Sequence, residues 1–265
     1  MPEVNTLLLC SYNILAQAYV EHQRGYGIPE PFLERKHRWM LIRKQLQKQD
    51  WQVMCLQEVD GYSVGLLSDQ FPEHTIFYSQ RPSGKEDGLA ILVHKDIQCL
   101  SQGTITLPAS EQKLGNRLLQ YVDLFWKERV VKIVNIHISW NAPQAKHSRG
   151  CIEMKAIVEW VVKQEETVVL CGDCNAEQGE EVLNLVLKDM RLALHPLLQR
   201  ENVTYWGAGE FQAIDHVLID HNLDGRVIEL TNASNMLFSP NHSEGSDHFL
   251  VGVELFWKQE HRGKR

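Results

Sequence analysis

The chain has 265 residues, of which 43% are hydrophobic, so it can bury a sizeable core and does not have the composition of a disordered protein. Its formal net charge of −7 excludes a protein that coats nucleic acid through excess positive charge, and it disfavours permanent attachment to anionic membranes. Any polynucleotide substrate must then be held by a local basic patch and by metal. We expect one catalytic domain spanning residues 1–265.

Three further features concern the compartment. The first apolar run, Leu7–Cys10, has no basic stretch before it and breaks at Ser11, so it is not typical of a signal peptide. No stretch reaches the ~18 apolar residues that a membrane span requires. The six cysteines lie mostly in apolar runs, which favours buried free thiols and a reducing compartment. We therefore expect a cytoplasmic protein without a membrane span.

In chain order, apolar runs of strand length alternate with stretches of helical periodicity. The stretch Glu34–Lys48 predicts a helix with Trp39, Ile42 and Leu46 on one face. Gln144–Lys163 and Glu180–Leu187 predict two more helices. The expected strands are Leu7–Ile14, Val53–Val59, Leu89–His94, Gln120–Phe125, Val130–Ile138, Thr167–Cys171, Ile214–Ile219, Val227–Thr231 and Phe249–Phe256.

This order of elements indicates the fold class. Many strands with few helices favour two sheets packed face to face with helices outside them. We therefore expect an α/β fold, a four-layer α/β/β/α sandwich of two mostly antiparallel or mixed sheets flanked by helices.

Polar side chains fall where the predicted strands begin or end. Buried carboxylates at such positions are costly unless they are paired or bound to a cation. With only oxygen and imidazole companions, they point to a hard metal such as Mg²⁺, for which Mn²⁺ can substitute. Each residue alone also has an ordinary structural explanation, such as a turn or a satisfied core histidine. The candidate site residues are Asn13, Glu58, His137, Asp173, Asn175, Asp215, Asp247 and His248.

Six short motifs in this order resemble the endonuclease/exonuclease/phosphatase superfamily, over residues 6–256. The motifs are Ser11-Tyr12-Asn13, Leu56-Gln57-Glu58, Asn135-Ile136-His137, Gly172-Asp173-Cys174-Asn175, Ile214-Asp215-His216 and Ser246-Asp247-His248. The stretch from Gly84 to Ile91 and His137-Ile138-Ser139-Trp140 are similar to the deadenylase-like branch that includes CCR4, nocturnin and Angel proteins. The chain departs from that branch in lacking a leucine-rich repeat segment and in a short stretch before Asp215.

The resemblance implies a role for each candidate. Glu58 is expected to be the main metal ligand, with Asn13 and Asp247 beside it. Asp173, Asn175 and His248 would surround the scissile phosphate from the other side, holding a second ion or positioning the attacking water. Asp215 would orient His248, and His137 would donate to a phosphate oxygen. These roles are those of a phosphodiesterase, most simply a 3′–5′ exoribonuclease.

The expected substrate is single-stranded RNA or a nucleotide-type phosphate. Trp140 and Phe211 are candidates for stacking on a base, and Lys85 and Arg149 for contacting phosphates, with Trp206 and Arg117 as further candidates. Phe211 is expected in an exposed loop because Gly207 and Gly209 flank it. A nucleotide phosphomonoester, a 2′,5′-linked oligonucleotide or a phosphoinositide remain alternative substrates, because one fold hosts many of them.

Two other functions compete with this interpretation. Gly61-Tyr62-Ser63-Val64-Gly65 follows an apolar strand and matches the nucleophile elbow of serine hydrolases, with Ser63 as the nucleophile. The alternative explanation of this stretch is the first turn of a helix capped by Asp60. A binding module without activity is the third interpretation, and it predicts an incomplete set of catalytic residues.

Overall fold

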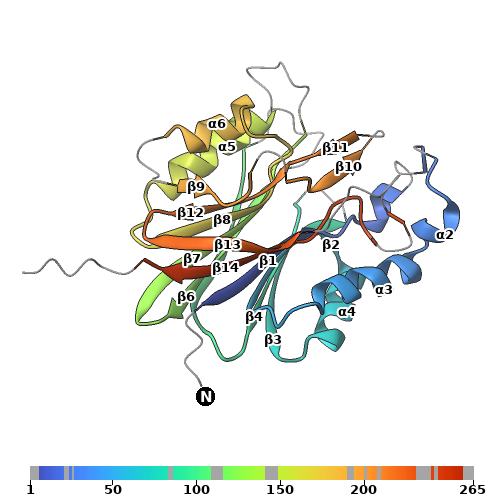
Figure 1. The fold of residues 1–265 in the computed structure, drawn as a ribbon, viewed down its shortest axis with the longest axis horizontal. Coiled ribbons are helices and arrows are strands. Elements are labelled where there is room, and N and C mark those ends of the chain that lie inside the picture. Colours follow the sequence, from blue (N-terminus) through green and yellow to red (C-terminus); the bar gives the residue numbers. More distant parts are fainter. Residues whose placement is uncertain are drawn as a thin grey trace, which may run out of the picture.

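The computed structural model describes residues 6–20, 24–25, 27–82, 86–108, 116–140, 149–189, 194–199, 202–207, 210–230, 240–241 and 244–258. Two six-stranded sheets face each other, and helices cover the outer face of each (Figure 1). The predicted four-layer α/β/β/α sandwich is therefore confirmed. Among the helices described, none has the length and hydropathy of a segment that spans a bilayer.

The first sheet has the strand order β13-β14-β1-β2-β4-β3. Its strands β1 and β2 are parallel, and the other neighbours are antiparallel. Helices α3 and α4 pack on its outer face. Its elements are β1 (Leu7–Asn13), β2 (Val53–Asp60), β3 (His74–Gln80), β4 (Asp87–His94), β13 (Leu223–Leu230), β14 (Val251–Trp257), η1 (Gln17–Tyr19), α2 (Glu30–Leu33), α3 (Arg35–Leu46) and α4 (Gly61–Gln70).

The second sheet has the order β5-β6-β7-β8-β12-β9 and repeats this plan. Its parallel pair is β7 and β8, and helices α5 and α6 cover its outer face. A separate hairpin of β10 and β11 lies at one end of the sandwich (Figure 1). The elements are β5 (Gln98–Thr106), β6 (Leu118–Trp126), β7 (Arg129–His137), β8 (Thr167–Asp173), β9 (Leu194–Pro196), β10 (Tyr205–Gly207), β11 (Glu210–Gln212), β12 (Asp215–Asp220), α5 (Arg149–Val161) and α6 (Glu181–Leu187).

Three apolar layers hold the sandwich together. The central layer lies between the sheets and joins side chains such as Leu9 and Val53 of the first sheet to Ile133 and Val169 of the second. The other two layers lie between each sheet and its helices. The strands at the middle of both sheets are therefore buried on two faces, which is why they form continuous apolar runs in the sequence.

The two parallel pairs determine where the strands end. Helix α3 connects β1 to β2, and α5 connects β7 to β8, so the carboxyl ends of these four strands meet at one edge of the sandwich. The antiparallel strands β12 and β14 begin at the same edge, because Asp215 pairs with Asp173 and Val251 pairs with Ser11. Ligand sites of α/β folds commonly lie outside the carboxyl ends of the strands.

Candidate active site

Four side chains from the ends of the parallel strands converge at this edge. Asn13 ends β1, and its Nδ2 lies 3.3 Å from Oε1 of Glu58 and 3.0 Å from Oδ2 of Asp173. Nε2 of His137 lies 3.3 Å from the same Asp173 oxygen and 3.9 Å from Glu58 Oε1. Because Asn13 and Glu58 come from the first sheet and Asp173 and His137 from the second, both sheets contribute to one cluster.

Glu58 reaches the cluster through a local irregularity of β2. Its φ of 57° lies in the left-handed region, and the pairing of β2 with β4 shifts register between Gln57 and Val59. Such a bulge redirects one side chain and is common beside functional sites. The backbone N–H of Ala16 donates to Glu58 Oε2 at 2.9 Å, which fixes the carboxylate in this orientation.

Gly172 allows β8 to bring Asp173 close to His137. Its φ is +136°, and a Cβ at this position would lie 2.0 Å from the carbonyl oxygen of Ile136 on β7. Only glycine therefore fits between the two strands here. Past the end of β8, the N–H of Asn175 donates to Asp173 Oδ1 at 2.8 Å, and Asn175 Nδ2 donates to the carbonyl of Ile138 at 2.9 Å. The carboxamide of Asn175 thus supports the turn.

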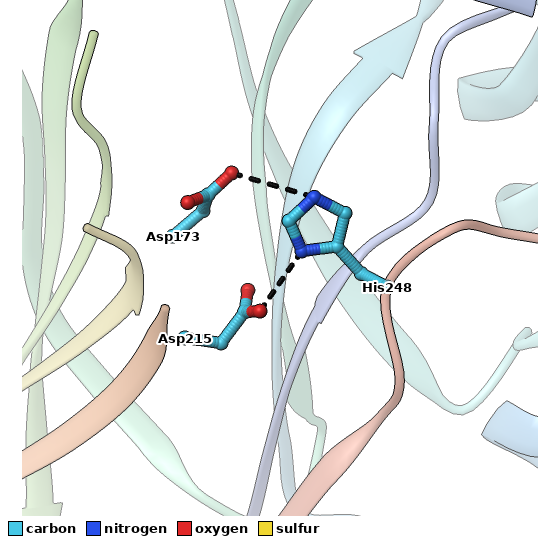
Figure 2. A group of neighbouring side chains, drawn as sticks. All are labelled: Asp173, Asp215 and His248. Atoms are coloured by element: carbon cyan, nitrogen blue, oxygen red, sulfur yellow. Dashed lines mark hydrogen bonds and ion pairs between the residues drawn. The ribbon is translucent and has the colours of Figure 1, made fainter. Parts of the chain in front are cut away.

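His248 lies between two aspartates, as Figure 2 shows. Its Nδ1 is 2.8 Å from Oδ2 of Asp215, and its Nε2 is 3.7 Å from Oδ2 of Asp173. Burial alone would lower the pKa of His248, but the fields of Asp215 and Asp173 outweigh it and raise the pKa to about 10. The imidazole therefore lies between two buried carboxylates whose charges favour its protonated form.

The hairpin and the segment before β14 hold His248 and its neighbour Asp247. Trp206 N donates to the carbonyl of Asp247, and Phe249 N donates to the carbonyl of Thr204, both at 2.8 Å. The ring centroid of Tyr205 lies 4.7 Å from that of His248. Through Thr204, Tyr205 and Trp206, these contacts connect β10 and the residue before it to the catalytic edge.

Several buried carboxyl groups at this edge resist ionisation. Burial, followed by the nearby charge of Asp247, raises the pKa of Glu58 to about 7. Burial also raises the pKa of Asp173 to about 6 and shifts that of Asp247 upward. Oδ1 of Asp215 is buried without a hydrogen-bond partner among the described residues. A cation would relieve this excess of buried negative charge, so the donor set fits a divalent metal ion.

Two groups of side chains offer ligand atoms. Asp173, Asp215 and His248 have ligand atoms within 4.8 Å of one another, and the imidazole of His248 could bind a metal only in its neutral form. Glu58, Asn13 and Asp247, the three predicted ligands, offer oxygen atoms that hard divalent ions prefer. Asp247 lies close enough for its charge to raise the pKa of Glu58. The eight predicted catalytic and metal-binding residues therefore all lie at this edge.

The four predicted substrate-binding residues have different environments. Trp140 is 71% exposed and lies just beyond His137. Arg149 is largely buried, and its Nε donates to Glu153 Oε1 at 2.9 Å. Lys85 lies outside the described residues. Phe211 is not in an exposed loop as expected, since it lies in β11, is half-buried and stacks on Phe249 with ring centroids 6.3 Å apart.

The nucleophile-elbow interpretation of Ser63 is wrong. Ser63 lies in the first turn of α4, where its backbone N–H donates to the capping carboxylate of Asp60 at 2.7 Å. Trp206 is also not available to a base, because it is 4% exposed and packs in an apolar cluster.

Sequence reasoning missed a set of polar residues behind the cluster. Arg117 was expected to contact phosphate, but its Nη1 is 2.9 Å from Nδ1 of His137. Arg38 donates to the carbonyls of Ile14, Leu15 and Gly245, so it joins the segment after β1 to the segment before β14. Only the charge of these residues is visible in the sequence, because their partners lie far away along the chain.

The fold and the site define a class of phosphate-ester hydrolase, and comparison with known proteins agrees. Residues 10–248 match the model of the endonuclease/exonuclease/phosphatase family, and the chain belongs to that family. It is therefore a metal-dependent hydrolase of phosphoric esters, either a phosphodiesterase or a phosphatase, as the sequence predicted.

The similar proteins include Angel and Nocturnin proteins. Protein angel of Drosophila melanogaster is 23% identical over 282 residues, which cover 92% of this chain and 78% of that protein. A structure of ANGEL2, described as a 2′,3′-cyclic phosphatase and bound to adenosine-2′,3′-vanadate, superposes with a TM-score of 0.79 at 18% identity, covering 96% of this chain and 97% of the other. The human Nocturnin catalytic domain superposes with a TM-score of 0.73 at 20% identity, and the match covers 96% of this chain and 95% of the other.

Proposed function

We propose that this protein is a Mg²⁺-dependent phosphodiesterase acting at the 3′ end of RNA, with Mn²⁺ able to substitute. The observation that carries the proposal is the convergence of Asn13, Glu58, His137, Asp173 and His248, from both sheets, within hydrogen-bonding or ion-pairing distance. Magnesium is favoured because carboxylate and amide oxygens dominate the predicted ligand set and no cysteine belongs to it.

We assign the metal to Glu58, Asn13 and Asp247. An Mg²⁺ ion held there would supply positive charge to neutralise the phosphate and stabilise the leaving oxygen. The protein residues do the remaining work of orientation and proton transfer. Asn13 also donates to Asp173 Oδ2, so it connects the proposed metal side of the site to the proposed water side.

Asp173 and His248 act on the attacking water in this proposal. Asp173 is buried, so its carboxylate is poorly solvated and its pKa is raised to about 6, nearer the range in which a general base works at neutral pH. Asp215 accepts from Nδ1 of His248 and thereby orients Nε2 toward Asp173 and the proposed position of the attacking water. The carboxamide of Asn175 keeps the turn that follows Asp173 in place.

His137 acts on the phosphate itself. Its imidazole is buried and beside Arg117, and both factors hold its pKa well below the usual value, so the ring is neutral. A neutral imidazole with a proton on Nε2 donates a hydrogen bond without itself releasing a proton. We assign this donor to a non-bridging phosphate oxygen, where negative charge grows in the transition state.

The substrate assignment rests on aromatic side chains near the site and on the named relatives. Trp140 is exposed beyond His137, and the half-buried ring of Tyr205 lies on His248. Aromatic rings bind single-stranded bases by stacking, which does not require a basic protein. Stepwise 3′–5′ hydrolysis of RNA is our first candidate, and single-stranded RNA or a nucleotide-type phosphate is the partner.

A second candidate is favoured by the likeness to ANGEL2, a 2′,3′-cyclic phosphatase. In that reaction the same site would open a terminal cyclic diester without shortening the chain. Both candidates place a phosphodiester at an RNA 3′ end in the same cluster, so they share the roles given above.

A panel of RNAs tests both candidates. One 5′-labelled RNA would carry a 3′-hydroxyl end, and a second would carry a 2′,3′-cyclic phosphate. Each would be incubated with Mg²⁺ and with chelator. The panel would also contain 2′,5′-oligoadenylate, nucleotide monophosphates and inositol phosphates. Progressive shortening of the first RNA supports the exonuclease, and loss of the cyclic end at constant length supports the second candidate. Turnover of a phosphomonoester or inositol phosphate alone would contradict both.

The cellular setting is part of the proposal. We infer that residues 1–265 work as one catalytic domain in the cytoplasm. All six cysteines are free, and five of them are buried, which suits a reducing compartment.

A further inference from the structure

Arg117 lies directly behind His137, on the side of the ring opposite the catalytic cluster. Its Nη1 is 2.9 Å from His137 Nδ1, whereas His137 Nε2 is 3.3 Å from Oδ2 of Asp173. The two ring nitrogens therefore have different partners, one a guanidinium and the other a carboxylate.

The chemistry of arginine determines the direction of the first hydrogen bond. A guanidinium has donors but no acceptor, and it stays protonated in proteins. If Nδ1 of His137 carried a proton, two N–H donors would face each other at a distance of 2.9 Å in a buried place. Leaving both donors unsatisfied would cost the desolvation penalty of each. Nδ1 must therefore accept, and in the neutral ring the single proton lies on Nε2.

We propose that Arg117 is a positioning residue that fixes the tautomer of His137, so that Nε2–H always faces the phosphate. The proposal deepens the function proposed above, because it explains how a neutral histidine serves as a dedicated donor. Without Arg117 only the 3.3 Å contact between Nε2 and Asp173 would favour this tautomer, so the other tautomer, which presents a lone pair to the negative phosphate oxygen, would become populated.

Arg117 is itself held by neighbours on two sides. Its Nε donates to Ser139 Oγ at 3.4 Å, and Glu153 in turn accepts from the backbone N–H and the hydroxyl of Ser139, both at 2.8 Å. On the other side, Oδ2 of Asp87 lies 4.0 Å from Arg117 Nη1. Burial of the guanidinium lowers its pKa, and nearby carboxylates such as Asp87 oppose that shift.

Asp87 is also oriented. Nη1 of Arg81 lies 3.2 Å from its Oδ2, and the hydroxyl of Tyr19 donates to its Oδ1 at 3.0 Å. These contacts restrain the guanidinium of Arg117 in the position that places Nη1 against His137. Such networks can hold a catalytic group to within a fraction of an ångström.

Nuclear magnetic resonance of ¹⁵N-histidine-labelled protein tests the proposal without any substrate. Long-range ¹H–¹⁵N correlations show which ring nitrogen carries the proton, and loss of a signal in His137→Gln assigns His137. The wild type should show only the Nε2–H form, Arg117→Met a mixture of tautomers, and Arg117→Lys mainly Nε2–H again. A wild-type ring protonated on Nδ1, or Arg117→Met unchanged, would overturn the proposal.

A kinetic cycle separates this role from a structural one. With a chromogenic phosphodiester, Arg117→Met should lower kcat about 10- to 100-fold, part of the ~10²–10³-fold that one transition-state donor supplies. Glutamine at position 137 donates through its amide whatever Arg117 does, so Arg117→Met should cost less than about threefold in the His137→Gln background. Equal losses in both backgrounds would contradict the proposal.

The buried Lys132, which pairs with Asp123 in the same sheet, supplies a matched control for loss of a buried cation. Lys132→Met should lower the melting temperature and leave both the tautomer and kcat unchanged. If neither the RNA panel nor the chromogenic diester is hydrolysed, the proposed function fails, while the resonance experiment still decides the role of Arg117.

Discussion

Nδ1 of His248 lies 2.8 Å from Oδ2 of Asp215, and both side chains are buried at the edge where the two sheets meet. The backbone N–H of Asp215 donates to Thr204 Oγ1 at 2.9 Å, which fixes the start of β12. Because Asp215 pairs with Asp173 across β12 and β8, one backbone register sets the positions of both carboxylates that flank the imidazole.

This relationship predicts the effect of Asp215→Asn. The amide can donate to Nδ1 and so stabilise the wrong tautomer, and it removes the charge that supports the imidazolium. We expect kcat to fall about 10²–10⁴-fold with little change in KM, measured on a chromogenic phosphodiester in saturating Mg²⁺. The control is Asp224→Asn, which changes an exposed carboxylate on β13 and should leave kcat unchanged. An Asp215→Asn enzyme of normal rate would remove Asp215 from the mechanism.

A second prediction concerns metal binding. Glu58→Gln keeps the size of the side chain but removes the negative charge that we assign to the metal. Titration calorimetry should show Mg²⁺ binding at least about tenfold weaker than in the wild type, with a correspondingly smaller rise of melting temperature on adding Mg²⁺. Glu73→Gln, exposed in the turn before β3, should bind as the wild type does. Unchanged affinity in Glu58→Gln would show that the ligand assignment is wrong.

A third prediction concerns base recognition. Trp140 is 71% exposed, so Trp140→Ala should leave stability nearly unchanged. If its ring stacks on a base at ~1–3 kcal/mol, KM for single-stranded RNA should rise about 5- to 160-fold, while KM for a small chromogenic diester stays constant. Equal changes on both substrates would mean that Trp140 supports the site and does not bind a base.

Phe211 serves as the contrast to Trp140. It is half-buried against Phe249, so we expect Phe211→Ala to lower the free energy of unfolding by about 1–3 kcal/mol in a denaturant titration. A variant that loses RNA affinity without losing stability would restore Phe211 as a direct base contact.

The fourth prediction concerns Gly172. Its positive φ and the Cβ clash with the carbonyl of Ile136 mean that Gly172→Ala must separate β7 from β8. We expect a loss of about 3 kcal/mol or more in the free energy of unfolding, together with a lower kcat because Asp173 and His137 move apart. Gly179→Ala is a useful comparison, since its φ is also positive but no atom lies within 4 Å of the added Cβ. Similar losses in the two variants would contradict the close-approach explanation.

The central strands and the edge strand β13 could be predicted from the sequence, and the other edge strands could not. Runs such as Thr167–Cys171 are buried on both faces, so their composition alone indicates a strand. The strands β3 and β5 lie at the outer edges of the two sheets, and their residues are half-buried or exposed, so they lack a continuous buried apolar run. The hairpin strands β10 and β11 have three residues each, too few for any periodicity.

The site shows the same division. Asp173 and Glu58 could be identified as candidate site residues because each is a charged residue at the end of a buried apolar run. Burying an unpaired carboxylate at such a position is costly. The contact between Arg117 and His137 was not identifiable, because it depends on the side-chain directions of a residue just before β6 and a residue at the end of the neighbouring strand β7. Phe211 was misjudged because the glycines around it favour a loop, whereas pairing with Trp206 forms a hairpin.

The central claim, metal-dependent hydrolysis at an RNA 3′ end, is tested most directly with 5′-labelled single-stranded RNA whose products are separated by length. In Mg²⁺ the wild type should shorten the RNA from its 3′ end one nucleotide at a time. Activity should vanish in EDTA, return with Mg²⁺ or Mn²⁺, and persist in Ser63→Ala. Full activity in EDTA, or RNA and its cyclic-phosphate form both left intact in Mg²⁺ while a phosphomonoester is consumed, would contradict the account.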